Sequence, residues 1–274
     1  MGLCVRLFCL ISSFLVFGFS AHADQSPLRK LITADEAKTW QAVGRIDLKN
    51  AGFCTGALIA PNLVLTAAHC MFHPETNVKL RPQDMEFKAG LRSGRAGALR
   101  KARRVVIHKD YRPGRDVKLD YVASDIALIE LTLPITANGI KAFTHKGKVA
   151  VGDEVKVVSY AQDRAEVPSI EEPCKVMGRD VRALVLTCNV DYGASGSPIF
   201  VEDNGELRIA SVVSAKAVVK GQKVALGASL GEPLEQLLSQ LSANRGVFQG
   251  KRPNGKSISE QLGNVQQTAK ILRP

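Results

Sequence analysis

The sequence predicts a mostly β protein, arranged as a sandwich or a barrel, with one helix late in the chain. Short runs of β-branched and aliphatic residues recur along the 274 residues, and Gly, Pro, Asn and Asp lie between them. Short strands divided by turn residues are typical of sandwiches and barrels rather than of alternating strands and helices. We expect strands at residues 56–59, 63–65, 104–107, 125–131, 154–158 and 209–213.

One stretch has the spacing of a helix instead. Five leucines between Leu230 and Leu241 follow helical intervals, which places them on one face of an α-helix. Pro233 near the start and Gly246 beyond the end are common helix boundaries. From residue 246 to residue 274 the chain is basic and polar, with room for a short helix around 261–272. We predict a tail there that contributes little to a core.

Composition excludes several classes of protein. Hydrophobic residues make up 45% of the chain and charged residues 23%, as in a folded globular protein rather than a disordered one. The sequence has no collagen-like glycine period, no heptad run and no second long apolar span, so repeat, coiled-coil and polytopic membrane proteins are excluded. A turn-rich stretch at 134–148 marks a boundary between residues 24–145 and residues 146–245.

The first residues predict export. Arg6 precedes the apolar run 7–19, and Ala21-His22-Ala23 follows it. This is the pattern of a secretory signal peptide, residues 1–23, cleaved after Ala23. A retained membrane anchor is the weaker alternative, because a spanning helix needs about 20 apolar residues. We expect the mature protein in a periplasm or outside the cell.

Four cysteines remain after that cleavage: Cys54, Cys70, Cys174 and Cys188. An even number of cysteines in an exported chain is typical of disulfides. Four cysteines allow three pairings, and we predict Cys54–Cys70 and Cys174–Cys188 because each pair lies within one half of the chain. A zinc site needs tighter cysteine or histidine spacing, so we expect no metal.

Three short motifs occur in a fixed order. Residues 65–70 read Leu-Thr-Ala-Ala-His-Cys, residues 125–128 read Asp-Ile-Ala-Leu, and residues 193–198 read Gly-Ala-Ser-Gly-Ser-Pro. They resemble the LTAAHC, DIAL and GxSGxP signatures of the chymotrypsin/trypsin family of serine endopeptidases, with a bacterial-type member as the expected match. An α/β-hydrolase has the order Ser, acid, His, and subtilisin-like enzymes place Asp before His, so neither fits.

The resemblance implies two six-stranded Greek-key barrels with a C-terminal helix. Residues 24–145 would form the N-terminal barrel, residues 146–245 the C-terminal barrel and helix, and the active site would lie in the cleft. The resemblance makes Ser195 the nucleophile, His69 the general base and Asp125 the carboxylate that orients the histidine. A serine hydroxyl needs an adjacent base, and histidine accepts and returns protons near neutral pH.

Other site residues also follow from the resemblance. The backbone amides of Gly193 and Ser195 would form the oxyanion hole, which stabilises the charge of the tetrahedral intermediate. Asn189, six residues before the nucleophile, and Ser214 would contact substrate. Because Asn189 is neutral, we expect a small or uncharged residue at the cleavage site. Asp125 is preferred to Asp116 and Asp120, which lie in a polar loop, because Asp125 opens an apolar run.

The motifs depart from the animal members at one point. Ala194 replaces the aspartate that pairs with a newly cut N-terminus, and the chain lacks an Ile-Val-Gly-Gly start. We therefore expect activity without cleavage of that kind. No metal or organic cofactor is implied, and the expected partner is a protein or peptide substrate.

Two alternatives remain. With 37 Lys+Arg against 26 Asp+Glu, a catalytically silent member of this fold could bind an anionic partner through its basic surface. An esterase-type hydrolase is the third reading, which residues 193–198 disfavour. The basic run at residues 92–104 lacks aromatic residues, so we expect no nucleic-acid binding; the basic segments would at most contact anionic envelope surfaces weakly.

Overall fold

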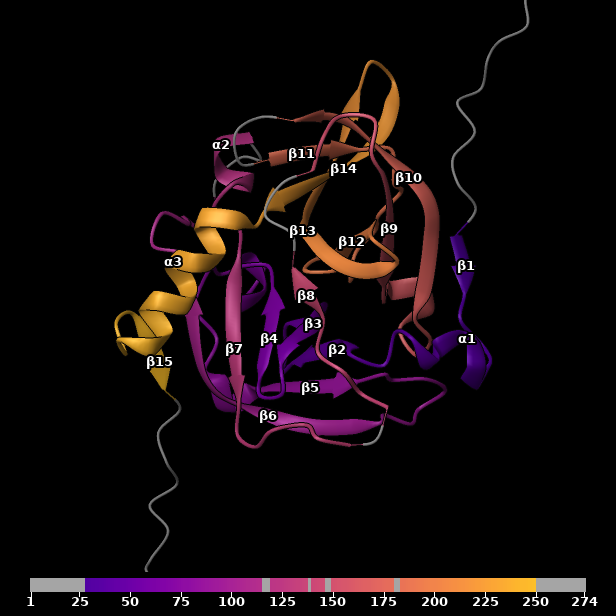
Figure 1. The fold of residues 1–274 in the computed structure, drawn as a ribbon. Helices are drawn as coiled ribbons and strands as arrows, with labels where there is room; N and C mark the ends of the chain where they lie inside the picture. Colours follow the sequence, from indigo (N-terminus) through magenta and orange to yellow (C-terminus); the bar gives the residue numbers. More distant parts are fainter. Residues whose placement is uncertain (1–27, 115–118, 138, 146–148, 180–182, 250–274) are drawn as a thin grey trace, which may run out of the picture.

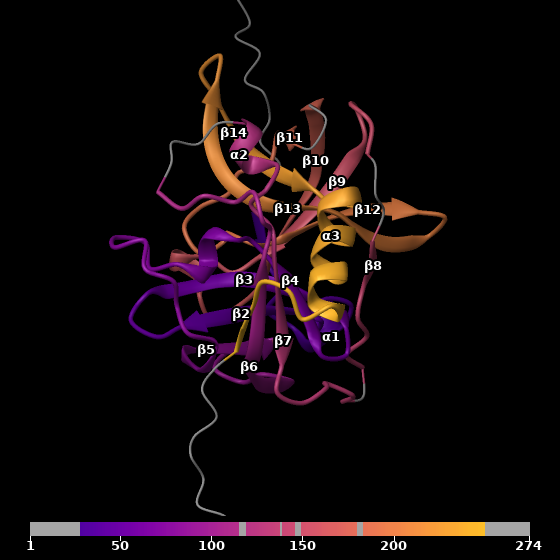
Figure 2. The same ribbon diagram turned by 90° about the vertical axis from the view of Figure 1, so that its left-hand side faces the viewer.

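The fold is described from a computed structural model, which covers residues 28–114, 119–137, 139–145, 149–179 and 183–249. The predicted signal peptide at residues 1–23 and the short helix expected around 261–272 lie outside the described residues. Figures 1 and 2 show two barrels, one above the other in these views, with one long helix beside them. The predicted all-β fold of two six-stranded barrels is confirmed.

The first barrel contains β2 to β7. Their order around the barrel is β6-β5-β2-β3-β4-β7, all antiparallel, and pairing of β6 with β7 closes it. Because β5 returns to lie beside β2, the first four strands form a Greek key. The strands are β2 (Val43–Leu48), β3 (Gly52–Ala60), β4 (Leu63–Thr66), β5 (Met85–Ala89), β6 (Ala98–Ile107) and β7 (Ala127–Leu131).

The second barrel contains β9 to β14 and repeats that topology. Its order is β10-β11-β14-β13-β12-β9, and pairing of β9 with β10 closes it. The strands are β9 (Glu154–Ser159), β10 (Ser169–Arg179), β11 (Ala183–Leu186), β12 (Pro198–Asp203), β13 (Glu206–Val219) and β14 (Gln222–Ser229). Every strand that the hydrophobic runs predicted is therefore present, although β7 begins at Ala127 rather than at residue 125.

The predicted late helix is α3 (Gly231–Ser242), whose Leu234 and Leu237 are fully buried. It lies beside the first barrel, although it follows the last strand of the second (Figure 2). Two short helices are α1 (Ala34–Lys38) and α2 (Leu119–Val122), and three 3₁₀ turns are η1 (His69–Met71), η2 (Pro82–Asp84) and η3 (Gln162–Arg164). None of the helices in the described part of the chain is long and apolar enough to cross a membrane.

Each end of the described chain pairs with the barrel formed by the other half of the sequence. β1 (Leu28–Lys30) pairs with β10 of the second barrel, and β15 (Val247–Gln249) pairs with β6 of the first. β8 (Thr144–His145) runs parallel to β13. We expected residues 24–145 to form the first barrel, but residues 28–30 pair with the second. The expected tail at 246–274 begins with a paired strand, β15. Three-residue segments are too short to show a strand pattern in the sequence.

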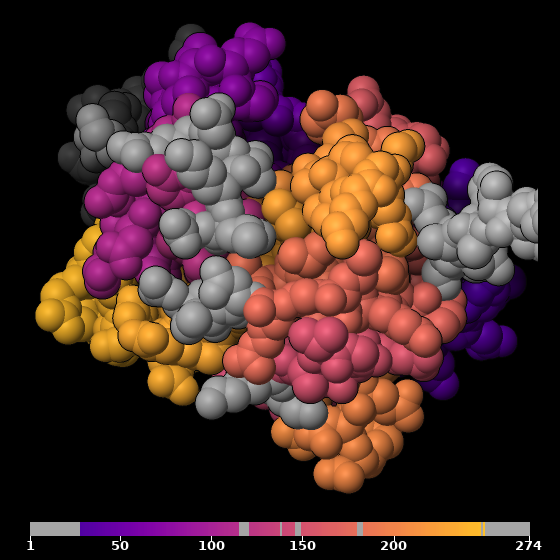
Figure 3. All heavy atoms as spheres, turned by 90° about the horizontal axis from the view of Figure 1, so that it is seen from above, coloured from indigo at the N-terminus to yellow at the C-terminus, as the bar shows by residue number. Residues whose placement is uncertain are grey.

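Aromatic side chains join the two barrels. Phe200 of β12 packs 5.1 Å from the ring of Trp40, which precedes β2, and 4.6 Å from the ring of Phe143 in the connection between the barrels. Trp40 and Phe200 are buried, so the contact removes large apolar surfaces from water. Seen from above, the magenta and purple part of the first half, together with α3, and the salmon and orange second half lie on opposite sides, while the first described residues lie beside the second half (Figure 3).

Candidate active site

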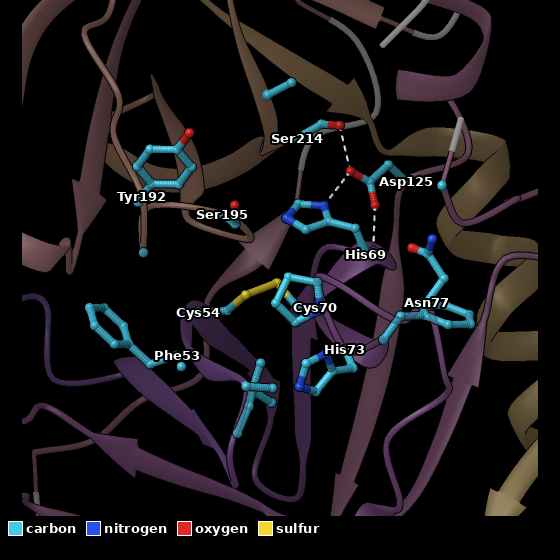
Figure 4. A pocket seen from close by; sticks show the side chains of 18 of the residues that line it. Phe53, Cys54, His69, Cys70, His73, Asn77, Asp125, Tyr192, Ser195 and Ser214 are labelled. Atoms are coloured by element: carbon cyan, nitrogen blue, oxygen red, sulfur yellow. Dashed lines mark hydrogen bonds and ion pairs between the residues drawn. A yellow bond between two sulfur atoms is a disulfide. The ribbon is translucent and has the colours of Figure 1, made fainter. Parts of the chain in front are cut away.

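A pocket of about 610 Å³ contains all three residues that the motifs singled out. His69 and Asp125 come from the first barrel, and Ser195 precedes β12 of the second. In Figure 4 the imidazole of His69 lies between the carboxylate of Asp125 and the side chain of Ser195. The structure therefore brings together three residues that are far apart in the sequence.

His69 is placed by the chain on both sides of it. It begins η1 three residues after the end of β4, and the two intervening residues, Ala67 and Ala68, are fully buried. The next residue, Cys70, forms the predicted disulfide with Cys54 of β3. The small alanines and the disulfide hold the turn against the barrel, and the His69 side chain is 33% exposed toward the pocket.

Asp125 binds His69 twice. Its Oδ1 accepts the backbone N–H of His69 at 2.8 Å, and its Oδ2 lies 2.7 Å from His69 Nδ1. Asp125 lies in a turn after α2, where its own N–H donates to the carbonyl of Val122, which is why β7 starts two residues later. At 4% exposure, this carboxylate is nearly removed from water, and the two contacts determine the direction of the ring.

Ser214 completes the environment of Asp125. Its hydroxyl donates to Oδ2 of Asp125 at 2.5 Å (Figure 4). We predicted Ser214 as a substrate contact; it lines the pocket, but its side chain bonds to the carboxylate. A buried carboxylate needs hydrogen-bond donors to offset lost hydration, and Ser214 supplies a third one.

The pKa of His69 reflects two opposing effects. Burial favours the neutral ring and lowers the pKa, whereas the charge of Asp125 and its hydrogen bond to Nδ1 raise the pKa. The net result is a pKa above the ordinary value of 6.5. Because Nδ1 is engaged by Asp125, Nε2 is the ring nitrogen left to accept a proton from the pocket.

Ser195 is held by the opposite barrel. The backbone N–H of Thr55, on β3, donates to the carbonyl of Ser195 at 2.8 Å, and the Thr55 hydroxyl donates to the carbonyl of Gly193 at 2.9 Å. Thr55 is fully buried between the barrels. Gly196 has φ +79°, and a Cβ there would collide with Thr66 and with the carbonyl of Thr55, so only glycine allows this close approach.

The peptide between Tyr192 and Gly193 has a defined orientation. The N–H of Gln162 donates to the carbonyl of Tyr192 at 2.9 Å, and in a trans peptide the N–H of Gly193 points the opposite way. Gly193 has φ +94°, which a side chain would resist. Among the described residues, neither the N–H of Gly193 nor that of Ser195 donates a hydrogen bond. Both residues line the pocket.

A family model described as Trypsin matches residues 32–184, more than half of the chain. This chain belongs to the trypsin family. It is similar to Serine protease 23 of Rattus norvegicus (29% identity over 167 residues, 54% of this chain and 43% of that protein), to Lectizyme of Glossina austeni (30% over 150 residues, 51% and 52%) and to Trypsin Blo t 3 of Blomia tropicalis (26% over 216 residues, 70% and 73%).

The match covers under half the length of the Serine protease 23 relatives. Among solved structures, the fold resembles that of a Glu endopeptidase in complex with MPD, with a TM-score of 0.66 and 19% identity over 81% of this chain and 98% of that one. At this identity, the likeness shows the trypsin-like fold.

We predicted that Asn189 would contact substrate in the pocket, but the structure places it elsewhere. The residue is exposed and does not line the pocket. Its backbone N–H instead contacts the carboxylate of Glu171 on β10. The adjacent Cys188 forms the predicted disulfide with Cys174, so both residues are bound to β10.

Several pocket residues were not predicted from the sequence. Phe53, His73 and Tyr192 line the pocket beside the predicted residues (Figure 4). Phe53 precedes Cys54, and His73 follows Cys70 by three residues, so the disulfide carries both to the pocket wall. In the sequence, only the closeness of these residues to the motifs could have indicated that they line the pocket, since Phe, His and Tyr also occur in many other settings.

Charges also meet at the edge of the pocket. Lys216 Nζ lies 2.9 Å from Oδ1 of Asp191 and 4.2 Å from the centre of the Tyr192 ring. The hydrogen bond from Lys216 lowers the pKa of Asp191, and the same bond raises the pKa of Lys216. The ion pair links the loop before Ser195 to the strand that carries Ser214.

One group of side chains in the described part of the chain has metal-like spacing. Cys54, His69 and Cys70 bring ligand atoms within 4.8 Å of one another. Both sulfurs are joined in the disulfide, so they are not thiolates, and Nδ1 of His69 is engaged by Asp125. This group is therefore unsuited to a metal ion.

Proposed function

We propose that this chain is an exported serine endopeptidase that hydrolyses peptide bonds through an acyl-enzyme. The observation that carries the proposal is the double contact of Asp125 with His69 in the pocket that contains Ser195. That contact leaves Nε2 of His69 as the base, and the backbone N–H groups of Gly193 and Ser195, which donate to no other described residue, provide donors for an oxyanion.

In the proposed reaction, Ser195 Oγ attacks the substrate carbonyl and its proton passes to Nε2 of His69. The carbonyl oxygen becomes an oxyanion, which the N–H groups of Gly193 and Ser195 stabilise. His69 then gives the proton to the leaving amine as the C–N bond breaks. Water repeats the sequence on the acyl-enzyme, which releases the acid and restores Ser195. Asp125 stabilises the imidazolium at each stage.

The deciding experiment compares Ser195→Ala with Ser197→Ala. Ser197 is a buried neighbour whose hydroxyl has no partner among the described residues, so its loss serves as a matched control. We expect Ser195→Ala to lower kcat/KM on a peptide library by at least about 10⁴-fold and to abolish fluorophosphonate labelling, while Ser197→Ala keeps both. Hydrolysis that survives Ser195→Ala would refute the proposal.

We also propose a bacterial-type member that is active without N-terminal cleavage. The relatives described above come from animals, so this part rests on the chain itself: Ala194 is buried and carries no carboxylate. The nearest candidate for a new N-terminus, Val43, is fully buried in β2, and its N–H donates to Trp40. The uncut mature chain should label with fluorophosphonate; labelling only after a clip near residue 43 would contradict this.

For specificity, we propose a small or uncharged residue at the cleavage site. The acid beside the pocket, Asp191, is neutralised by Lys216, so it offers little attraction to a cationic substrate side chain. Mass-spectrometric mapping of cleavage sites in a peptide library tests this. Cleavage mainly after Lys or Arg would overturn it.

Export is proposed from residues 1–23 and supported by the two disulfides, which form in oxidising compartments. N-terminal sequencing of secreted protein should begin at Asp24. The alternative of a silent protein that binds an anionic partner has weaker support, because the basic residues Lys101 and Arg103 are exposed on either side of the buried Ala102 along β6. Such a pattern is the ordinary solvated face of a strand.

A further inference from the structure

A buried acid outside the proposed catalytic triad lies against the chain that leads to Ser195. Glu171, on β10, is 1% exposed. Both of its carboxylate oxygens lie 2.9 Å from the backbone nitrogen of Asn189. The side chain of the next residue, Glu172, lies on the opposite face of the strand, where it pairs with Arg29 of β1 and Lys156 of β9. Burying a carboxylate is costly unless it has donors, and the donor here belongs to the nucleophile segment.

The same strand holds two consecutive residues of that segment. Cys188 is bonded to Cys174, and Asn189 donates to Glu171, so β10 restrains the chain where it leaves β11. At the other end, Thr55 of the first barrel binds the carbonyls of Gly193 and Ser195. The segment 188–195 is thus held from both barrels, and among the described side chains Glu171 is the one that binds the backbone N–H of Asn189.

We propose that Glu171 is a positioning residue: its carboxylate anchors Asn189 and thereby holds residues 189–195 in the arrangement that presents Ser195 and the amide of Gly193 to the pocket. Glu171 acts through the backbone and touches no substrate. The proposal rests on the function proposed above, and it assigns to a side chain of β10 the support that a new N-terminus would otherwise provide.

The charged groups around Glu171 set its ionisation. Burial raises its pKa most strongly, while the Asn189 N–H and the charge of Arg164 lower it, and the net value is about 7. Arg164 lies on η3, is 4% exposed and binds Ser159 and Asp163. Among the described residues on the neighbouring segments, Asp191 is paired with Lys216, and Lys156 and Arg29 are paired with Glu172.

This pKa predicts opposite effects of pH on order and on stability. Above about pH 7 both oxygens accept the Asn189 N–H, and below it one oxygen becomes an O–H, so the anchor weakens as the pH falls. Fold stability follows the raised pKa: the contribution of Glu171 is full below its ordinary value of 4.5 and is lost as the pH rises through about 7.

The test uses Glu171→Gln and Glu171→Ala, with Glu172→Gln as the matched control on the outward face of the same strand. Glu171→Ala leaves the Asn189 N–H without an acceptor, and we expect kcat to fall by about tenfold to a hundredfold with KM changed less, since misplacement of reacting groups acts on the chemical step. Glu171→Gln mimics the protonated acid, with one oxygen left to accept the Asn189 N–H, so its activity near pH 8 should fall severalfold, less than in Glu171→Ala.

The pH profile separates positioning from a merely structural role. Below neutral pH, the kcat/KM of the wild-type protein should fall with a slope that reflects the uptake of two protons, one by His69 and one by Glu171. In Glu171→Gln only His69 takes up a proton, so the slope should reflect one. Identical acid limbs in the two proteins, or equal kinetics for folded Glu171→Ala and Glu172→Gln, would overturn the proposal. If Glu171→Ala does not fold, the profile of Glu171→Gln decides.

Amide hydrogen exchange gives a readout that needs no activity. Peptides covering residues 189–195 should exchange faster in Glu171→Ala than in Glu172→Gln. Faster exchange in a protein that neither cleaves peptides nor labels at Ser195 would support the anchor while refuting the proposed function. Unchanged exchange would refute the anchor itself.

Discussion

The two halves of the pocket are held in different ways. On the first barrel, the side chain of Asp125 fixes His69 through adjacent ionic and backbone contacts. On the second barrel, Ser195 and Gly193 are placed by their backbone carbonyls, which bind Thr55 of the other barrel. The first arrangement depends on a charge and the second on packing between barrels. Substitutions should therefore affect the two halves differently.

The largest effect beyond loss of Ser195 itself is expected from Asp125→Asn. The substitution removes the charge that raises the pKa of His69, while burial remains, so that pKa should fall below its wild-type value. An amide at this position also favours the wrong tautomer of the ring, and kcat should drop by about 10⁴-fold. Rate measurements and NMR titration of His69 check both outcomes, with the exposed Asp110→Asn as control.

The same substitution has a consequence for stability. Because the pKa of His69 is raised in the fold, the attraction of Asp125 for the protonated ring stabilises the protein fully below about pH 6.5 and is lost as the pH rises through the folded value. Asp125→Asn should therefore lose more stability at pH 5 than at pH 9. An equal loss at both values would contradict a charge-based role for this half of the pocket.

A smaller effect is expected from Thr55→Val, which tests the half held by packing. The change keeps the shape and the N–H that binds Ser195, but it leaves the carbonyl of Gly193 and the N–H of Tyr160 without the hydroxyl. We expect a loss of about 1–3 kcal/mol in the free energy of unfolding and a fall in kcat of about tenfold, measured by denaturation and by peptide hydrolysis.

Thr66→Val is the matched control, because Thr66 is equally buried and, among the described residues, its hydroxyl donates to one acceptor, the carbonyl of Thr55. It should lower stability to a similar degree with a smaller effect on kcat. If Thr55→Val lowers stability and leaves kcat unchanged, the first barrel does not position Ser195.

Lys216→Ala should have the smallest effect on rate. It should, however, change which residue is preferred at the cleavage site. Lys216 is exposed, so the free energy of unfolding should change by less than about 0.5 kcal/mol. The substitution frees the charge of Asp191 beside the pocket, and cleavage after Lys or Arg should rise severalfold in a peptide library. Lys223→Ala, an exposed lysine on β14, should leave the preference unchanged, and an unchanged preference in both variants would exclude Asp191 from specificity.

Local patterns along the chain were sufficient for much of this protein. The alternation of short apolar runs and turn residues predicted the strands, and leucine spacing predicted α3, because strands and helices bury one face with a fixed period. Motifs around His69, Asp125 and Ser195 predicted which residues share the pocket, and nearness within each half of the chain predicted both disulfides.

Other features depended on contacts between distant segments. These features are contacts between different strands or barrels: the bond from Asn189 to the buried Glu171, the bond from Ser214 to Asp125, and the bonds from Thr55 to the segment that carries Ser195. The paired strands β1 and β15 are likewise decided by the sheet edges they meet. Periodicity reports which face of an element is buried, whereas the partner of a buried polar group is set only when the barrels close and pack together.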